Sequence, residues 1–361
     1  MAKYYFRLPS LQELTPPQQS AMDETRPIAL SGGPGTGKSV VSILRHIRRH
    51  INNKNTLLLT YTTTLARYLR ECCAIHNPTA ASNVKTSMKT LWENSFDVKN
   101  IIAGHWEEII IDEAQDLPIA YYQRIKPFTK VSYGADDSQS LYPDKGSKTS
   151  ELRELFDANA DYPLDRNFRN TQRVMRFAKT VFPDASIDPN IIPNLGKNVG
   201  EMPRFLITNH VGRDVTNPKQ NNAVMEIINT FKTIDHNIAI LVPWGKTHVP
   251  VFVEVLRQNG FVEDIDFSFY YEDSVIFPNG CPTIQNIHIT TFKSSKGLEF
   301  HTVIIPNFDI CKKVLNNQLD KKHNVEWQDY YVAVTRARNN LYLISSFDIP
   351  DFNNVTEKQV L

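Results

Sequence analysis

The chain has 361 residues, of which 41% are hydrophobic and 22% charged, so it has the composition of a globular protein and the length of two domains. Lys+Arg of 40 against Asp+Glu of 39 leaves a net charge of +1, which excludes overall basicity as a reason for binding nucleic acid. The four cysteines form no C-x-x-C pair, and no run approaches the ~20 apolar residues of a membrane span. We therefore expect a cytoplasmic protein without disulfides, a zinc site or a membrane partner.

Short apolar runs alternate with amphipathic segments of helical period in the first part of the chain. Continuous apolar runs bounded by turn residues are typical of strands buried on both faces of a parallel sheet. Strands are predicted at 27–31, 56–60, 107–112 and 130–136, and helices at 39–50, 64–75 and 118–126.

The same alternation starts again after residue 162. It predicts an α/β fold with two tandem domains, 1–162 and 163–361, and a long surface loop at 183–201. In the second domain, strands are predicted at 203–208, 237–243, 287–291, 301–306 and 341–345, and helices at 171–182, 223–233, 247–259 and 326–338.

The segment SGGPGTGKS (31–39) matches the P-loop pattern G-x-x-x-x-G-K-S and lies between a predicted strand and a predicted helix. In such a loop, backbone N–H groups surround phosphates, Lys38 neutralises their β and γ oxygens, and Ser39 holds Mg²⁺. The alternative is a chance glycine-rich turn. The predicted nucleotide-binding residues of this loop are Gly32, Gly33, Pro34, Gly35, Thr36, Gly37, Lys38 and Ser39.

A second segment, IIIDEAQD (109–116), ends an apolar strand in two consecutive carboxylates. Asp112 at the strand end can hold Mg²⁺, and Glu113 can orient and deprotonate an attacking water. The alternative is a helix N-terminus at which acids are favoured by the helix dipole. Together the two segments predict ATP and Mg²⁺ as cofactors.

These and six further segments make the chain resemble the superfamily 1A helicases of the UvrD/Rep type, in the order of that family's motifs. The resemblance implies two RecA-like P-loop NTPase domains with mostly parallel sheets and ATP in the cleft between them. The six are LTPPQQSA (14–21, Q motif), LLLTYTTTLARYLR (57–70, Ia), GADDSQSLY (134–142, III), LDRNFRNT (164–171, IV), TTFKSSKGLEF (290–300, V) and YVAVTRAR (331–338, VI).

The resemblance also implies roles for residues at the nucleotide. Gln18 would read the adenine and Phe168 would stack on it, while Gln139 would sense the γ-phosphate. Glu299 would approach the nucleotide from motif V. Arg169 and Arg336 would act as arginine fingers; isolated arginines are otherwise surface charges.

Single-stranded nucleic acid is the implied partner, with DNA favoured over RNA. Tyr61 would stack on a base, and each such stack contributes about 1–3 kcal/mol to binding. The alternative is that Tyr61 is a core residue, since a tyrosine at a strand end is also typical of a core. Thr291, Lys293 and Ser294 would contact phosphates, and Lys293 stands where the family usually has histidine.

Two features depart from the family. The stacking aromatic that normally follows motif III is replaced by a predicted turn, Pro143-Asp144-Lys145-Gly146, and another aromatic nearby, such as Tyr142 or Trp92, is an alternative platform. The stretches 70–107 and 171–289 leave little room for the accessory domains called 1B and 2B, so the chain is expected to be a compact member.

The resulting hypothesis is a nucleic-acid-dependent ATPase, a helicase or 3′–5′ single-strand translocase. The alternative is an ATP-operated nucleic-acid sensor that controls a protein partner, such as a nuclease in a defence or repair complex; an RNA-directed helicase also stays open. Two basic segments, 45–50 and 321–324, are interpreted as solvated helix faces rather than as contacts with nucleic acid or a partner.

Overall fold

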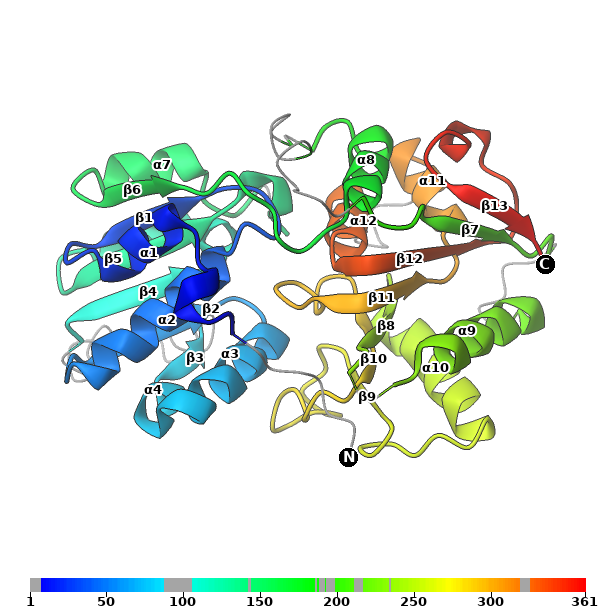
Figure 1. Cartoon of the computed structure of the whole chain (residues 1–361), viewed down its shortest axis with the longest axis horizontal. Helices are drawn as coiled ribbons and strands as arrows, with labels where there is room; N and C mark the ends of the chain where they lie inside the picture. Colours follow the sequence, from blue (N-terminus) through cyan, green and yellow to red (C-terminus); the bar gives the residue numbers. More distant parts are fainter. Residues whose placement is uncertain are drawn as a thin grey trace. The chain divides into compact units, whose positions relative to one another are not determined.

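The computed structural model describes most of the chain as two compact units, of which the N-terminal unit ends at Phe168 and the C-terminal unit begins at Arg169. Figure 1 labels their helices and strands along the chain. The described residues are 8–87, 106–141, 144–185, 187, 192, 199–210, 217–233, 235–318 and 325–361.

The N-terminal unit contains a six-stranded parallel sheet in the order β3-β2-β4-β5-β1-β6. Its central strands β2 and β4 are buried along their whole length, as their apolar runs predict. The strands are β1 Ile28–Ser31, β2 Thr56–Thr60, β3 Val84–Thr86, β4 Glu108–Asp112, β5 Lys130–Ala135 and β6 Ala160–Pro163.

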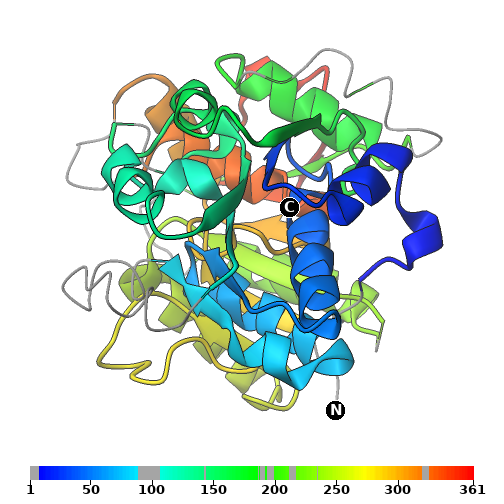
Figure 2. The same ribbon diagram turned by 90° about the vertical axis from the view of Figure 1, so that its left-hand side faces the viewer.

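Helices cover both faces of this sheet (Figures 1 and 2). One face packs Leu58 and Ile110 against helices α2, α3 and α4, and the other packs Leu57 and Ile109 against α6 and α7. The alternation follows from the period of two along each strand. The helices are α1 Pro16–Asp23, α2 Lys38–Ile51, α3 Thr63–His76, α4 Pro78–Ser82, α6 Ile119–Ile125 and α7 Thr149–Leu155, with short 3₁₀ turns at Leu11–Glu13, Ala114–Asp116 and Asp137–Gln139.

The N-terminal unit extends beyond the boundary expected at residue 162. Strand β6 pairs with β1, and the chain after it stays attached to the P-loop because Leu164 N donates to Ser31 O (2.8 Å) and Phe168 N to Gly35 O (2.9 Å). Motif IV is therefore divided, with Phe168 in the N-terminal unit and Arg169 in the C-terminal unit.

The C-terminal unit contains a seven-stranded parallel sheet in the order β13-β7-β12-β11-β8-β10-β9. Its strands are β7 Arg204–Ile207, β8 Ile238–Val242, β9 Phe267–Tyr270, β10 Ile287–Thr291, β11 Phe300–Ile305, β12 Ala337–Ser345 and β13 Glu357–Val360.

Helices α9 and α10 pack on one apolar cluster of this sheet, which includes Ile228, Val249 and Phe252. A second, aromatic cluster joins Phe177 of α8, Phe205 of β7 and Phe308 before α11. The helices are α8 Gln172–Val181, α9 Pro218–Phe231, α10 Gly245–Gln258, α11 Asp309–Leu315 and α12 Trp327–Val334, with a 3₁₀ turn at Pro350–Phe352.

The helix predicted at 326–338 is too long. Helix α12 ends at Val334, and residues from Ala337 onward form β12, which pairs with β11 in the register Phe300↔Ala337. Pairing with a neighbouring strand overrides the local helical pattern. Arg336 consequently lies in the tight connection between α12 and β12, where Phe300 N donates to its carbonyl (2.9 Å).

The two stretches expected to lack accessory domains hold elements of the units themselves. The described part of 70–107 contains the end of α3, α4, β3 and the approach to β4, and 171–289 contains α8 to β9 of the C-terminal sheet and the start of β10. Among the described residues, no helix combines the length and apolar character needed to cross a membrane.

Candidate functional site

The P-loop connects β1 to α2 in a conformation that only glycine permits at two positions. Gly32 has φ 142° and Gly37 has φ 90°, and both values lie in the region that favours glycine. A Cβ at Gly32 would lie 2.2 Å from Leu164 O, and one at Gly37 would lie 2.4 Å from Gln18 Nε2. The loop therefore packs closely between the Q motif and the start of motif IV.

Lys38 begins helix α2 with its ammonium group turned back into the loop. Its Nζ donates to Gly32 O (2.6 Å) and Gly33 O (2.9 Å) and lies 3.6 Å from Asp136 Oδ2. The side chain is buried. Lys38 thus occupies the centre of the loop, where a cation can meet phosphate oxygens.

The other P-loop residues surround this cation. Thr36 and Pro34 are buried, and Thr36 Oγ1 donates to Gly33 O (2.9 Å). Gly33, Gly35 and Ser39 are half-buried, and Ser39 lies in the first turn of α2. The free N–H groups of a helix's first turn and its dipole favour a bound anion at this end.

Asp112 and Glu113 lie where strand β4 ends, beside the P-loop. A Cβ built on Gly134 of the adjacent strand β5 would lie 3.5 Å from both Asp112 Oδ1 and Lys38 Cβ, so these two side chains lie over the same residue of the sheet. Glu113 adopts a left-handed backbone conformation (φ 57°), and its Oε2 accepts from Gln115 Nε2 (2.7 Å). Such strain is typical of functional sites.

Motif III is hydrogen-bonded to motif II. Gln115 Oε1 accepts from Asp136 N (3.1 Å), and Asp116 Oδ1 accepts from Leu141 N (2.9 Å). Gln139 Nε2 donates to the carboxylate of Asp136, which also faces Lys38. The predicted γ-phosphate sensor is therefore connected to the P-loop lysine through one carboxylate.

Sequence reasoning missed Asp136 and Gln115 as members of this site. Asp136 ends the predicted strand 130–136 in the same way that Asp112 ends the predicted strand 107–112, and Gln115 stands inside DEAQD. Because carboxyl ends of neighbouring parallel strands meet at one sheet edge, the repeated strand–carboxylate pattern could have indicated Asp136.

Gln18 and Phe168 both contact the P-loop. Gln18 Nε2 donates to Thr36 O (3.0 Å), and its Oε1 accepts from Thr15 N (2.9 Å), so the amide joins helix α1 to the loop. Phe168 is bound through its backbone to Gly35, and its exposed ring lies 5.2 Å from the Arg166 guanidinium. An exposed ring beside the loop is suited to stacking on a base.

The donor set at this sheet edge fits a magnesium nucleotide. Lys38 and the N-terminus of α2 suit phosphates, and Ser39 with the Asp112 carboxylate supplies the oxygen ligands that Mg²⁺ prefers. In the described part of the chain, no three His, Cys, Asp or Glu side chains gather as a metal cage.

In the C-terminal unit, Glu299 is held by two arginines. Arg169 Nε donates to Glu299 Oε2 (3.0 Å) and Arg338 Nη1 to Oε1 (2.8 Å). Burial alone would raise the pKa of Glu299, but the charges of Arg169, Arg338 and Arg336 lower it below its usual value. Arg338 was not predicted as a site residue, although it lies two residues after Arg336 in the same motif.

Arg336 is buried and donates to acceptors of its own unit. These are Val332 O (2.9 Å), Leu298 O (3.3 Å) and Thr335 Oγ1 (3.1 Å). Through Val332 O and Leu298 O, Arg336 connects α12 to the motif V segment. Both predicted arginine fingers are thus bound by protein acceptors in this conformation.

The predicted nucleic-acid residues belong to different units. Tyr61 follows β2 and packs partly buried against the core of the N-terminal unit. In the C-terminal unit, Thr291 ends β10, and its Oγ1 accepts from Ser294 N (3.1 Å). Lys293 Nζ lies 3.8 Å from Asp329 Oδ2. The structure brings Thr291, Lys293 and Ser294 together within one turn.

The segment after motif III includes an exposed turn at Asp144 and Lys145, as expected. It is followed by Ser147, whose N donates to Gln115 O (3.1 Å) and whose Oγ donates to Leu117 O (2.6 Å). Trp92, Tyr142, Pro143 and the basic segment 321–324 lie outside the described residues, as does most of the loop 183–201.

The interpretation of segment 45–50 as a solvated helix face is wrong for two of its residues. Arg45 and His46 are fully buried. Arg45 pairs with Glu108 across the sheet, and His46 is bound by Thr56 and Ala80. These partners lie 10 to 63 residues away in the sequence, so the local run of basic residues did not show that Arg45 and His46 are buried.

Comparisons with known proteins agree with the motif order. Residues 277–347 match the UvrD-like helicase C-terminal domain, and residues 18–140 match an AAA domain. The protein named ATP-dependent DNA helicase R568, of Acanthamoeba polyphaga mimivirus, is 26% identical over 257 residues. That match covers 66% of this chain and 34% of the relative, so the chain spans about a third of the relative's length.

Among solved structures, S. cerevisiae Dbp5 bound to RNA and ADP BeF3 is 11% identical, with a TM-score of 0.51 over 96% of this chain and 94% of that chain. The Arterivirus nonstructural protein 10 (helicase) with DNA is 13% identical, with a TM-score of 0.39 over 94% and 65%. The likeness to Dbp5 concerns the fold alone. With the two mostly parallel sheets, it confirms the predicted α/β class.

Proposed function

This chain belongs with the UvrD-like superfamily 1 helicases, and from that premise we propose that it is a nucleic-acid-dependent ATPase that couples ATP hydrolysis to movement along a single strand. The observation that carries the proposal is the meeting of Lys38, Asp112 and Asp136 at one sheet edge beside Glu113. One cation and several carboxylates around a helix N-terminus suit phosphoryl transfer better than any other common reaction.

In the proposed reaction, Lys38 exchanges the carbonyls of Gly32 and Gly33 for phosphate oxygens. Ser39 and Asp112 would hold Mg²⁺, which when bound would supply positive charge against the charge that develops on the phosphates. Glu113 orients the attacking water and accepts its proton. Gln115 keeps the Glu113 carboxylate in place through its 2.7 Å hydrogen bond.

The finer roles rest on the same proposal. Gln18 and Phe168 would bind the adenine, and Gln139 would report the γ-phosphate through Asp136, which also faces Lys38. Arg169 and Arg336 would act as arginine fingers on the γ-phosphate, and Glu299 would approach the nucleotide. Each arginine would have to leave its present acceptors to contact phosphate.

We propose that the nucleic acid bound by this chain is single-stranded DNA, and that the chain moves along it in the 3′–5′ direction. Thr291, Lys293 and Ser294 would contact phosphates, and Tyr61 would contact a base. This choice is supported by the motif order and by the match to a relative named as a DNA helicase.

The test is Mg²⁺-dependent ATP hydrolysis measured alone and with single-stranded DNA, single-stranded RNA or duplex DNA. We expect stimulation by single-stranded DNA, abolition by Lys38→Ala, and a kcat loss of about 10²–10⁴-fold in Glu113→Gln with ATP binding retained. Glu107→Gln is the control, because Glu107 precedes the same strand and pairs with Lys54 at the surface. Wild-type hydrolysis by Glu113→Gln would refute the assignment.

A second candidate is a nucleotide-operated sensor that controls a partner such as a nuclease. The exposed carboxylate of Asp144 favours it, because a carboxylate repels phosphate and cannot stack on a base where the family has an aromatic. Translocation along a labelled single strand separates the two. ATP hydrolysis without directional movement would support the sensor, whereas processive unwinding by the chain alone would exclude it.

A further inference from the structure

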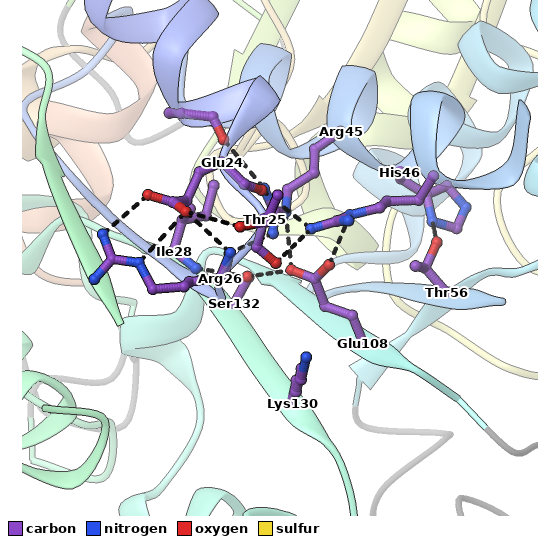
Figure 3. Close-up of polar contacts among 12 residues, drawn as sticks. Glu24, Thr25, Arg26, Ile28, Arg45, His46, Thr56, Glu108, Lys130 and Ser132 are labelled. Carbon is purple, nitrogen blue, oxygen red and sulfur yellow. Dashed lines mark hydrogen bonds and ion pairs between the residues drawn. The ribbon is translucent and has the colours of Figure 1, made fainter. Parts of the chain in front are cut away.

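A buried ion pair lies at the amino end of the N-terminal sheet, away from the phosphate site (Figure 3). Arg45 stands on α2 seven residues after Lys38, and Glu108 begins β4, the strand that ends in Asp112. Arg45 Nε donates to Glu108 Oε1 (2.8 Å), and neither side chain is more than 5% exposed. Helix α2 therefore carries Lys38 at its start and Arg45 in its middle, and strand β4 carries Glu108 at its start and Asp112 at its end.

The Glu108 carboxylate is fixed by further donors. The Ser132 hydroxyl of β5 donates to Oε1 while accepting from Ile28 N (2.8 Å), and Arg49 Nε lies 3.2 Å from Oε2. Glu108 thus joins α2 to three adjacent strands, β4, β5 and β1. Its carboxylate holds Arg45 in one orientation.

The remaining donors of Arg45 all reach one segment, 21–26. Nη1 donates to Ala21 O (3.2 Å) and Glu24 O (2.6 Å), and Nη2 donates to Arg26 O (2.7 Å). Arg49 Nη2 also donates to Glu24 O and Thr25 O, both at 3.1 Å. These carbonyls belong to the last turn of α1 and to the segment that leads into β1. The two arginines therefore fix the direction in which the chain leaves helix α1.

The same short helix carries Gln18 near its other end. Gln18 is bound to Thr36 of the P-loop, and only one turn, about 4.5 Å along the axis, separates it from Ala21. A helix of this length is rigid, so a tilt at its carboxyl end moves Gln18 as well. The position of Gln18 over the loop therefore depends on Arg45.

Stability alone does not account for these charges. A buried ion pair costs desolvation and contributes no more to stability than apolar residues of similar size. Burial lowers the pKa of Arg45, although the charge of Glu108 acts against it, and a guanidinium nevertheless stays protonated. What an apolar side chain cannot supply is the planar set of donors that binds three carbonyls at once.

We propose that Arg45, oriented by Glu108, is a positioning residue that holds helix α1 so that Gln18 can recognise the adenine base. The inference rests on the proposed function, in which Gln18 reads that base. It assigns nucleobase selectivity to a buried cation on the helix that also carries the phosphate-binding lysine.

The test compares Arg45→Lys with wild type by equilibrium Kd for ATP and GTP and by kcat. Lysine keeps the charge beside Glu108 but cannot bind several carbonyls in one plane. We expect the preference for ATP over GTP to fall by about fivefold, the loss expected for roughly one hydrogen bond, through weaker ATP binding. We expect kcat at saturating ATP to stay within about twofold, because the phosphate groups are untouched.

Two further variants keep the result interpretable. Arg48→Lys is the matched control, since Arg48 lies on the same helix but pairs with Asp23 at the surface, and it should keep wild-type selectivity. Gln18→Ala combined with Arg45→Lys should be no less selective than Gln18→Ala alone, because both act through one contact. If Arg45→Lys does not fold, Glu108→Gln replaces it, because it removes the charge that orients Arg45 while keeping the size of the side chain, and the preference for ATP should change in the same direction.

Equal losses for ATP and GTP, or a loss confined to kcat, would overturn the proposal and leave Arg45 a structural residue. Wild-type protein that binds ATP and GTP equally would overturn it too. Wild-type protein that prefers ATP in binding yet never hydrolyses it would overturn the proposed function instead, since the positioning role is judged from Kd alone.

Discussion

Asp329 makes the stability of the C-terminal unit depend on pH in a direction opposite to that of most carboxylates. It lies in the first turn of α12, where its Oδ2 accepts from Glu326 N (3.0 Å) and lies 3.8 Å from Lys293 Nζ. Burial raises the pKa of Asp329 from 3.8 to about 6, and Glu326 adds to the rise, while Lys293, the Glu326 N–H and Lys296 lower it. Replacement by Asn removes the titrating group and keeps the shape.

The sign follows from where the proton is held. Between pH 3.8 and about 6 the folded chain keeps the Asp329 proton, whereas the unfolded chain releases it. The free energy of unfolding therefore decreases as pH rises through this window and is level above it. A shift of roughly two units corresponds to about 3 kcal/mol.

The assay is urea unfolding at a series of pH values from about 4 to 7, followed by tryptophan fluorescence. Between about pH 4 and pH 7, the free energy of unfolding of wild type should fall by about 3 kcal/mol relative to that of Asp329→Asn. Asp351→Asn, an exposed carboxylate of the same unit, is the control. Parallel pH profiles for Asp329→Asn and wild type would refute the claim that burial of this carboxylate shifts its titration.

Two further predictions concern the C-terminal unit. Arg336→Ala should reduce kcat by about 10³-fold or more with a smaller change in ATP Kd, and, because three acceptors lose their donor, should also lower Tm. A large loss of ATP affinity at unchanged kcat would contradict a finger role. Lys293→Ala should reduce the slope of log affinity against log salt for single-stranded DNA by about 0.7, the contribution of one phosphate contact, as measured by fluorescence anisotropy. An unchanged slope would mean that Lys293 does not contact a phosphate of the bound strand.

Apolar runs predicted the central strands correctly because burial on both faces leaves a strong local signal. The edge strands were missed for the opposite reason. Strand β6 consists of Ala160, Asp161, Tyr162 and Pro163, and only its pairing with β1 makes it a strand. That pairing carries the chain to Phe168 before the second unit begins, so the expected boundary was too early.

The P-loop and the DEAQD carboxylates could be identified from sequence, because each is a continuous pattern with a direct chemical meaning. The contact between Asp136 and Lys38 could not, since it depends on the strand order β4-β5-β1. The burial of Arg45 was equally inaccessible, because its carboxylate partner lies 63 residues away. A charge pattern reveals which side chains are ionic and leaves open which of them face solvent.

The exposed turn at Asp144 and Lys145 lies between two residues that are hydrogen-bonded to the segment after strand β4, which also carries Glu113. Leu141 N is bound by Asp116 before the turn, and Ser147 is bound by Gln115 and Leu117 after it. A surface connection with fixed ends tolerates replacement, because the closure entropy of a longer loop grows slowly with its length. Asp144 and Lys145 are therefore expected to tolerate substitution, so different residues placed there, an aromatic among them, can be compared in strand binding without disturbing the contacts of Gln115 and Asp116.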